Sequence, residues 1–160
     1  MIFVTLGTMH LDFARLVRKV DAIARTTGER VVVQTGLAKS VPNHCEHFAF
    51  RGRVEIAGLI DESRLVVSHA GIGSVIDVLK AGRPLVVVPR MKRFGEHNND
   101  HQLDLAEAVE KRGWGRMVTD IDDLDSLCAR PPAAYAGYAP ARQSLIDAVR
   151  DSIHALGRAG

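Results

Sequence analysis

The stretch that most constrains the fold of this chain runs from Leu65 to Leu79. An apolar, β-branched run ending at Ser68 leads into a glycine-containing turn, after which apolar residues recur at helical spacing. This pattern predicts a strand, a tight turn and a helix. We expect Gly71 and Gly73 to take backbone angles closed to other residues and to leave space for a ligand. The first free N–H groups of the helix would then form a phosphate cradle.

Two polar side chains follow the turn. Ser74 adds a hydroxyl, and Asp77 lies on the same helix face, where an ionised carboxylate can accept hydrogen bonds from both hydroxyls of a ribose. Glycine turns before helices are common, and an early helical Asp is favoured by the dipole without any ligand, so this pattern alone leaves nucleotide binding open. Neither the dinucleotide fingerprint nor the Walker loop is present.

The size and composition predict one domain over residues 1–160, because 160 residues with 46% hydrophobic content fill one core but not two. The basic residues are dispersed, the net charge is only +2 and 5% of residues are aromatic, which argues against nucleic acid as a partner. The chain enters a strand without a basic leader, and its apolar runs are shorter than a membrane span. We therefore expect a soluble, cytoplasmic protein without a transmembrane segment.

Strands and helices alternate along the chain. This alternation predicts an α/β fold with a parallel sheet, helices on both faces and right-handed crossovers. We expect a Rossmann-like, doubly wound sheet of six strands in the order 3-2-1-4-5-6. The glycine turns after strands one and four then meet at the switch point where such sheets bind ligands. Strands are predicted at residues 1–6, 31–34, 45–50, 65–68, 85–88 and 114–118, and helices at 11–25, 55–61, before 82, 98–111, 121–127 and 141–156, with an irregular crossing segment at 129–140.

Two spacings resemble metal sites. His97 and His101 have the i, i+4 spacing of helical zinc ligands, but the Glu of a zinc protease motif and an obvious third ligand are absent. Asp120 and Asp122 form an Asp-x-Asp pair, yet they follow the last strand and open a short helix, where Asp serves as a cap. We therefore predict no metal site.

Three further groups have ordinary interpretations. Residues 44–47 alternate His, Cys, Glu and His along a predicted strand, which favours packing. Residues 90–97 are basic and glycine-broken, so we expect a mobile loop with solvated arginines at 90–93, although beside a diphosphate these could supply charge. Cys45 and Cys128 are expected to be reduced, buried thiols.

Four segments, residues 3–8, 67–74, 82–89 and 99–106, together resemble the nucleotide-sugar-binding half of GT-B glycosyltransferases. The resemblance covers residues 1–120 in register and extends to three groups within that class: the family 28 C-terminal domain, the small subunit of the two-component N-acetylglucosaminyltransferase of N-glycan assembly, and bacterial exopolysaccharide counterparts. It implies a hexosyltransferase with a UDP-sugar as substrate and no tightly bound metal or other cofactor.

The resemblance also implies roles for particular residues. It places the donor pyrophosphate on two turns, the ribose on Asp77, where the family usually has Glu, and the uracil near Arg53. The donor sugar would contact His101 and Gln102, whose side chains can donate and accept hydrogen bonds. His10, in the first glycine loop, is the one local candidate for a general base. The implied residues of the two turns are Gly7, Thr8, His69, Gly71, Gly73 and Ser74.

The resemblance further implies a second chain, because GT-B catalysis occurs in a cleft between two Rossmann-like domains and 160 residues supply only the donor half. The expected partner is membrane-anchored, the acceptor lipid-linked, and this chain peripheral to the inner membrane face. Residues 129–160 could dock the partner, or their apolar stripe could pack on the chain's own sheet. A non-catalytic regulatory or scaffold module that binds nucleotides is the alternative function. The stripe comprises Leu145, Ile146, Val149, Ile153 and Leu156.

Overall fold

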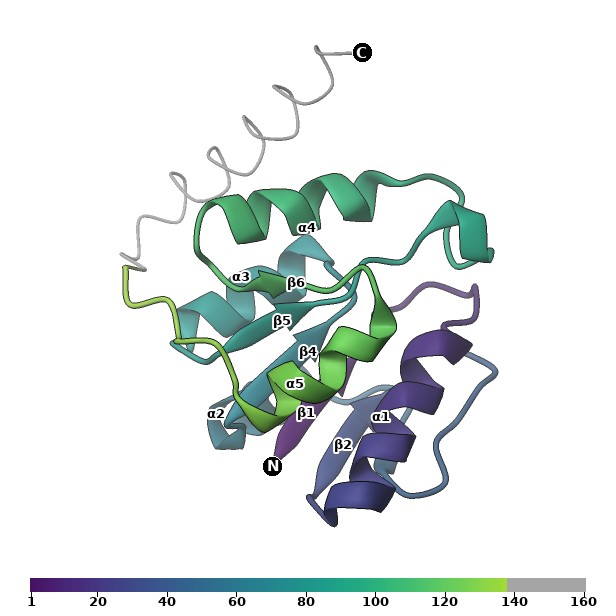
Figure 1. The fold of residues 1–160 in the computed structure, drawn as a ribbon. Helices are drawn as coiled ribbons and strands as arrows, with labels where there is room; N and C mark the ends of the chain where they lie inside the picture. The colour runs from purple at the N-terminus through teal and green to yellow at the C-terminus, as the bar shows by residue number, and fades with distance from the viewer. Residues whose placement is uncertain (138–160) are drawn as a thin grey trace.

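A computed structural model describes residues 1–137 and contains one six-stranded parallel sheet in the order β3-β2-β1-β4-β5-β6 (Figure 1). This order and the α/β class confirm the prediction. The strands are β1 (Ile2–Thr5), β2 (Val31–Gln34), β3 (Glu46–Phe48), β4 (Leu65–Ser68), β5 (Leu85–Val87) and β6 (Arg116–Met117). The helices are α1 (Ala14–Thr27), α2 (Arg53–Glu62), α3 (Ile72–Lys80), α4 (His101–Lys111) and α5 (Leu124–Ala129), with short 3-10 turns η1 (Lys92–Phe94) and η2 (Ile121–Asp123).

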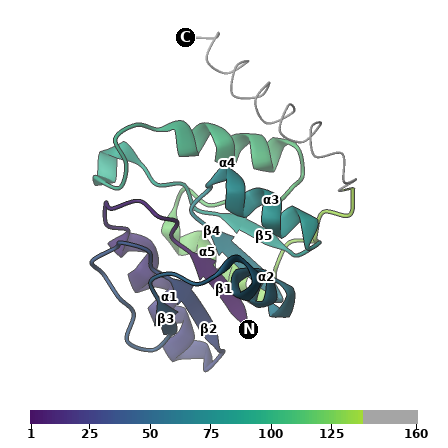
Figure 2. The same cartoon turned by 180° about the vertical axis from the view of Figure 1, so that it is seen from behind.

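Helices cover both faces of the sheet, and the alternation of side chains along the central strands explains how (Figures 1 and 2). Ile2 and Val4 of β1 pack in one core with residues of α1 and α5. Phe3, between them, packs in the other core with residues of α2, α3 and α4. Both faces of the central strands β1 and β4 are therefore buried, which is why these strands are continuous apolar runs. Because all six strands are parallel, their carboxyl ends lie along the same side of the sheet, called the carboxyl edge below.

Several element boundaries differ from the prediction. Helix α1 begins at Ala14, three residues later than expected, because the Asp12 carboxylate accepts hydrogen bonds from the Phe13 and Ser40 N–H groups and holds the preceding segment as a loop. Helix α4 also begins late, at His101, while α2 begins early, at Arg53. The strands predicted at 45–50 and 114–118 are shorter, at Glu46–Phe48 and Arg116–Met117.

Both cysteines are buried and unpaired, as predicted. Burial raises the pKa of the Cys45 thiol to about 12 and that of Cys128 to about 11, so both are protonated and poorly nucleophilic at neutral pH. Within residues 1–137, every helix is too short or too polar to cross a membrane.

Residues 130–137 are irregular, as predicted, whereas Ala129 still belongs to α5 and residues 138–140 of the predicted crossing segment lie outside the described residues. Tyr135 in this segment packs edge-on against Trp114, with ring centroids 6.4 Å apart. The helix predicted at 141–156 and its apolar stripe lie outside the described residues.

Candidate functional site

Two glycine loops leave the sheet side by side at its carboxyl edge. Thr5 at the end of β1 is paired in register with Ser68 at the end of β4, so the next residues of both strands emerge together. The His69 backbone N–H and its ring Nδ1 both lie near the Thr5 carbonyl oxygen, at 3.1 and 3.2 Å. A Cβ atom on Gly7 would lie 2.4 Å from His69 Nε2, and one on Gly71 would lie 2.2 Å from the same atom. The two loops therefore enclose one imidazole ring.

The His69 ring is neutral at physiological pH. Burial lowers its pKa to about 4, and the nearby positive charge of Arg90 acts in the same direction. Because the Thr5 carbonyl can only accept, the proton lies on Nδ1 and Nε2 is unprotonated. His69 thus acts as a neutral spacer between the loops.

The structure corrects the expected role of the glycines in the turn before α3. Gly71 has an ordinary φ of −77°, and Gly73 lies within the first turn of α3. The residue with left-handed backbone is Ala70, at φ 64°. Gly71 is needed for space, because a side chain there would collide with His69. A Cβ on Gly73 would meet no atom within 4 Å, so this position faces open space.

The beginning of α3 suits an anion. No side chain caps the helix, and Val75 is the first residue whose N–H bonds back to the turn, to the Gly71 carbonyl. Within the described part of the chain, the N–H groups of residues 72–74 therefore have no protein acceptor. They carry the positive end of the helix dipole toward solvent beside the first glycine loop.

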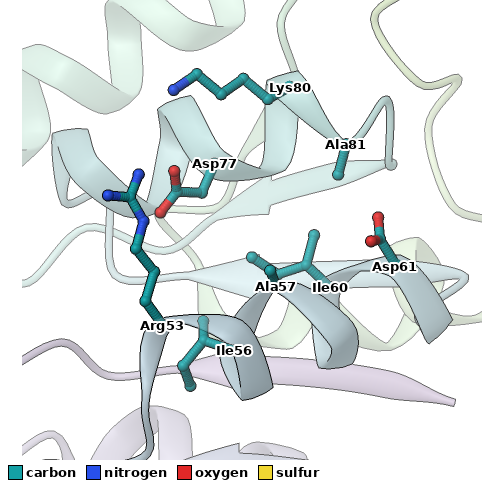
Figure 3. Close-up of a pocket in the computed structure, with 8 residues that line it drawn as sticks. All are labelled: Arg53, Ile56, Ala57, Ile60, Asp61, Asp77, Lys80 and Ala81. Carbon is teal, nitrogen blue, oxygen red and sulfur yellow. The ribbon is translucent and has the colours of Figure 1, made fainter.

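A groove of about 310 Å³ lies between α2 and α3 (Figure 3). The side chains of Arg53 and Asp77, from the two helices, point toward one another at one end of it. Apolar side chains of α2 line its wall. A carboxylate that can accept from a diol and an apolar wall that can take a flat ring therefore share one groove. The lining residues are Arg53, Ile56, Ala57, Ile60, Asp61, Asp77, Lys80 and Ala81.

The predicted sugar-contacting residues lie at the start of α4. The Gln102 side-chain oxygen accepts a hydrogen bond of 3.2 Å from the Arg90 backbone N–H, which leaves its NH₂ group as the available donor. The His101 side chain is 75% exposed, and its Nδ1 lies 3.6 Å from an Asp104 carboxylate oxygen. His10 is exposed, and among the described residues no carboxylate hydrogen-bonds to its ring.

Arg90 is the important residue that sequence reasoning missed. It was expected to be a solvated loop residue, but its side chain is fully buried and its guanidinium donates to backbone carbonyls of the first glycine loop. Its neighbours Met91 and Glu96 are buried as well. An arginine directly after an apolar strand and a proline was the available signal, because this position lies at the carboxyl edge.

The two metal-like spacings have ordinary structural roles. The Asp120 carboxylate accepts from the Asp122 N–H at 3.0 Å and so caps η2, as predicted. His97 Nδ1 accepts from the Asn99 N–H. Within residues 1–137 there is no group of three or more His, Cys, Asp or Glu side chains that could hold a metal ion.

Comparison with known proteins identifies similar sequences. Residues 1–129 match the glycosyltransferase family 28 C-terminal domain. A human protein named UDP-N-acetylglucosamine transferase subunit ALG13 is 34% identical over 144 residues, which cover 81% of this chain and 12% of that protein. The protein of the same name from Debaryomyces hansenii is 42% identical over 72 residues, 45% of this chain and 32% of that protein. The chain therefore spans less than half of either relative.

Solved structures share the fold. A crystal structure of the calicheamicin glycosyltransferase CalG4 superposes with a TM-score of 0.62 at 18% identity, covering 96% of this chain and 38% of that one. The NMR structure of ALG13 superposes with a TM-score of 0.61 at 21% identity, covering 90% and 93% of the two chains. The six-stranded sheet described above is thus a fold that this chain shares with these solved structures.

Proposed function

We propose, because the chain belongs to the family of the glycosyltransferase family 28 C-terminal domain, that it is the donor-binding subunit of a UDP-sugar-dependent glycosyltransferase. The observation that carries this proposal is that one helix, α3, has an uncapped start beside the two glycine loops and also contributes Asp77 to the groove that it shares with Arg53. The similar human and yeast proteins are named as UDP-N-acetylglucosamine transferase subunits, so UDP-N-acetylglucosamine is the first donor to test. They give no support to a role in exopolysaccharide synthesis.

In this proposal each part of the donor meets a different part of the site. The pyrophosphate lies on the free N–H groups of residues 72–74 and the loop at Gly7 and Thr8. The ribose diol is bound by Asp77, and the uracil lies against the wall of α2 near Arg53. The helix dipole and N–H groups offset the diphosphate charge, so no metal ion is required.

Transfer breaks the bond between the anomeric carbon and the UDP oxygen and forms a bond from that carbon to an acceptor hydroxyl oxygen, whose proton passes to a base. The departing UDP keeps the bonding electrons, and the N–H groups at α3 stabilise its added charge. His10 is the candidate base in this chain, but it lacks an orienting carboxylate among the described residues. We therefore propose that the partner chain supplies the general base.

The exposed apolar residues support a partner over the same edge. Within residues 1–137, each exposed large apolar side chain lies in the loop after the carboxyl end of a strand or in the first turn of the helix or 3-10 turn that follows that loop. A chain that brings the acceptor to the sugar must cover this edge, and it would bury these side chains. We propose that the partner is membrane-anchored, that it binds a lipid-linked acceptor and that it holds this chain at the cytoplasmic membrane face. The residues are Leu37, Val41, Phe50, Val54, Ile72 and Phe94.

The proposal is tested by calorimetric titration of the chain with UDP, UDP-N-acetylglucosamine and NAD, followed by transfer assays to a lipid acceptor with and without the partner. Binding of the UDP compounds but not NAD, and transfer that the partner raises, is the expected result. Binding without transfer under every pairing would instead favour the regulatory module. Transfer by the chain alone, at a rate that the partner does not raise, would contradict the split enzyme.

Deletion of residues 145–160 tests which surface binds the partner, the exposed apolar residues at the carboxyl ends of the strands or the predicted C-terminal stripe. If the shortened chain folds and binds UDP but no longer binds the partner, the stripe is the docking surface.

Replacing Asp77 with Ala should weaken UDP and UDP-N-acetylglucosamine binding to the same extent. The ribose would lose charge-assisted hydrogen bonds to the carboxylate, each worth about 1.5–3 kcal/mol, so affinity should fall by at least about tenfold. Asp61→Ala is the matched control, since Asp61 lines the same groove. Unchanged UDP affinity in Asp77→Ala would remove Asp77 from the site.

Replacing Gln102 with Glu should reduce the preference for UDP-N-acetylglucosamine over UDP by roughly tenfold, the equivalent of one lost hydrogen bond. Glu retains an oxygen that accepts from the Arg90 N–H but replaces the NH₂ donor that faces the sugar. Gln102→Ala should shift the preference in the same direction. Competition titrations measure both ligands, and an equal loss for UDP and the UDP-sugar would make Gln102 structural.

A further inference from the structure

Arg90 lies directly behind the first glycine loop and binds both of its ends. Nη2 donates to the Leu6 carbonyl at 2.9 Å, and Nη1 donates to the carbonyls of Leu11 at 2.8 Å and Asp12 at 3.2 Å. The guanidinium carbon lies 4.6 Å from the centre of the Phe13 ring, in cation–π contact. One planar group therefore sets the distance between the two ends of the loop that contains Gly7, Thr8 and His10.

The same residue also orients the start of α4. Its backbone N–H donates to the Gln102 side-chain oxygen at 3.2 Å, which turns the NH₂ group of Gln102 away from Arg90. The Arg90 Nη1 group donates in addition to the Glu96 carbonyl at 3.3 Å, which ties the loop after β5 to the loop after β1. Arg90 thus hydrogen-bonds both to the two ends of the predicted pyrophosphate loop and to the predicted sugar-contacting amide.

An ion pair between Arg15 and Glu96 braces this arrangement from the side of α1. Arg15 makes a bidentate bond to the buried Glu96, with Nε–Oε1 at 3.0 Å and Nη2–Oε2 at 2.9 Å, and also donates to the Pro89 carbonyl. Glu96 in turn accepts from the Met91 N–H. The segment on both sides of Arg90 is therefore held to α1, so the guanidinium cannot easily move relative to the loop it binds.

Burying an arginine costs free energy, because the charged group loses its hydration. Burial lowers its pKa to about 10, and its buried Nε has no hydrogen-bond partner among the described residues. An apolar side chain could fill the volume, but it could not donate to carbonyls at the two ends of a loop. The cost is explained if the geometry of the loop matters more than stability.

We infer that Arg90 is a positioning residue, which fixes residues 7–12 and the Gln102 amide in one arrangement so that the pyrophosphate and the sugar of a donor are contacted together. The inference deepens the proposed function and rests on it. It assigns Arg90 no direct contact with the donor, because the side chain is fully buried.

Arg90→Lys is the informative variant, because Lys keeps the charge but cannot bridge Leu6 and Leu11 with a planar fork. Arg93→Lys is the matched control, since Arg93 is exposed on the same loop. Hydrogen exchange of the ligand-free protein should be faster at residues 7–12 in Arg90→Lys and unaltered in Arg93→Lys. Titrations with UMP, UDP and UDP-N-acetylglucosamine should show unchanged UMP affinity, weaker UDP and a loss of about 10²-fold for the UDP-sugar.

Three results would overturn the inference. If Arg90→Lys has the hydrogen exchange rates and ligand affinities of the wild type, a positive charge at this position is enough to hold the loop. Equal losses for UMP, UDP and the UDP-sugar would indicate a general loss of stability, as would failure of both Arg90→Lys and the neutral Arg90→Gln to fold. The exchange measurement needs no ligand, so it tests the loop even if the wild-type chain binds no UDP, which would refute the proposed function instead.

Discussion

A Gly73→Val variant is expected to lose UDP binding by roughly a hundredfold or more while remaining folded. A Cβ on Gly73 meets no protein atom within 4 Å, so a β-branched side chain fits the folded chain. It would project beside the free N–H groups of α3 and exclude the phosphates from them. Loss of two charge-assisted hydrogen bonds, each worth about 1.5–3 kcal/mol, accounts for a decrease of this size. Calorimetric titration with UDP measures the loss, and thermal unfolding checks the fold.

Gly71→Ala is the informative contrast to Gly73→Val. Its Cβ would lie 2.2 Å from His69 Nε2, so the turn or the imidazole must shift and the protein should lose stability as well as affinity. In Gly73→Val, UDP affinity should fall while the stability of the fold is unchanged. Wild-type UDP affinity in Gly73→Val would show that the phosphates do not lie at the beginning of α3.

Acid should destabilise the chain through His69. The folded state holds this ring neutral, with a pKa of about 4, whereas the unfolded chain protonates it near 6.5. Between these values the unfolded state binds more protons, so the free energy of unfolding falls as pH is lowered through this window. The expected loss is roughly 3 kcal/mol between pH 6.5 and 4, and stability from this source is complete above pH 6.5. Urea titrations across the window measure it.

His69→Gln is the control for this pH dependence. It removes the titrating ring, so its stability should be lower than wild type at pH 7 but nearly level between pH 6.5 and 4. The carboxyl groups whose pKa values are lowered, Asp12, Asp21 and Glu29 among them, titrate below their ordinary values of 3.8 to 4.5 and act mainly below this window. The same pH dependence in His69→Gln and wild type would contradict the assignment to His69.

The architecture was predictable because its signals are local. The apolar runs at β1, β2, β4 and β5 and the turns between them follow from the alternation of strand and helix patterns, and the handedness of crossovers then leaves few strand orders. The proximity of the glycine turns after β1 and β4 was also predictable, since the carboxyl ends of neighbouring parallel strands lie at the same edge of the sheet. Asp120 was correctly interpreted as a cap for the same reason, because a cap bonds within two residues.

The contacts that complete the candidate site depend on residues far apart in sequence, which no local pattern encodes. Arg90 is in a basic run that looks solvated, and only the assembled sheet, in which β1 and β5 lie on either side of β4, brings its guanidinium to the Leu6 and Leu11 carbonyls. Gly71 is glycine because of the His69 ring rather than its backbone angles, and the left-handed residue is Ala70. Periodicity thus determined the elements and their order, because hydrophobic burial acts along each segment. Only the tertiary structure decided which polar groups lose water and must find partners, because burial of a side chain is a property of the assembled sheet and its loops.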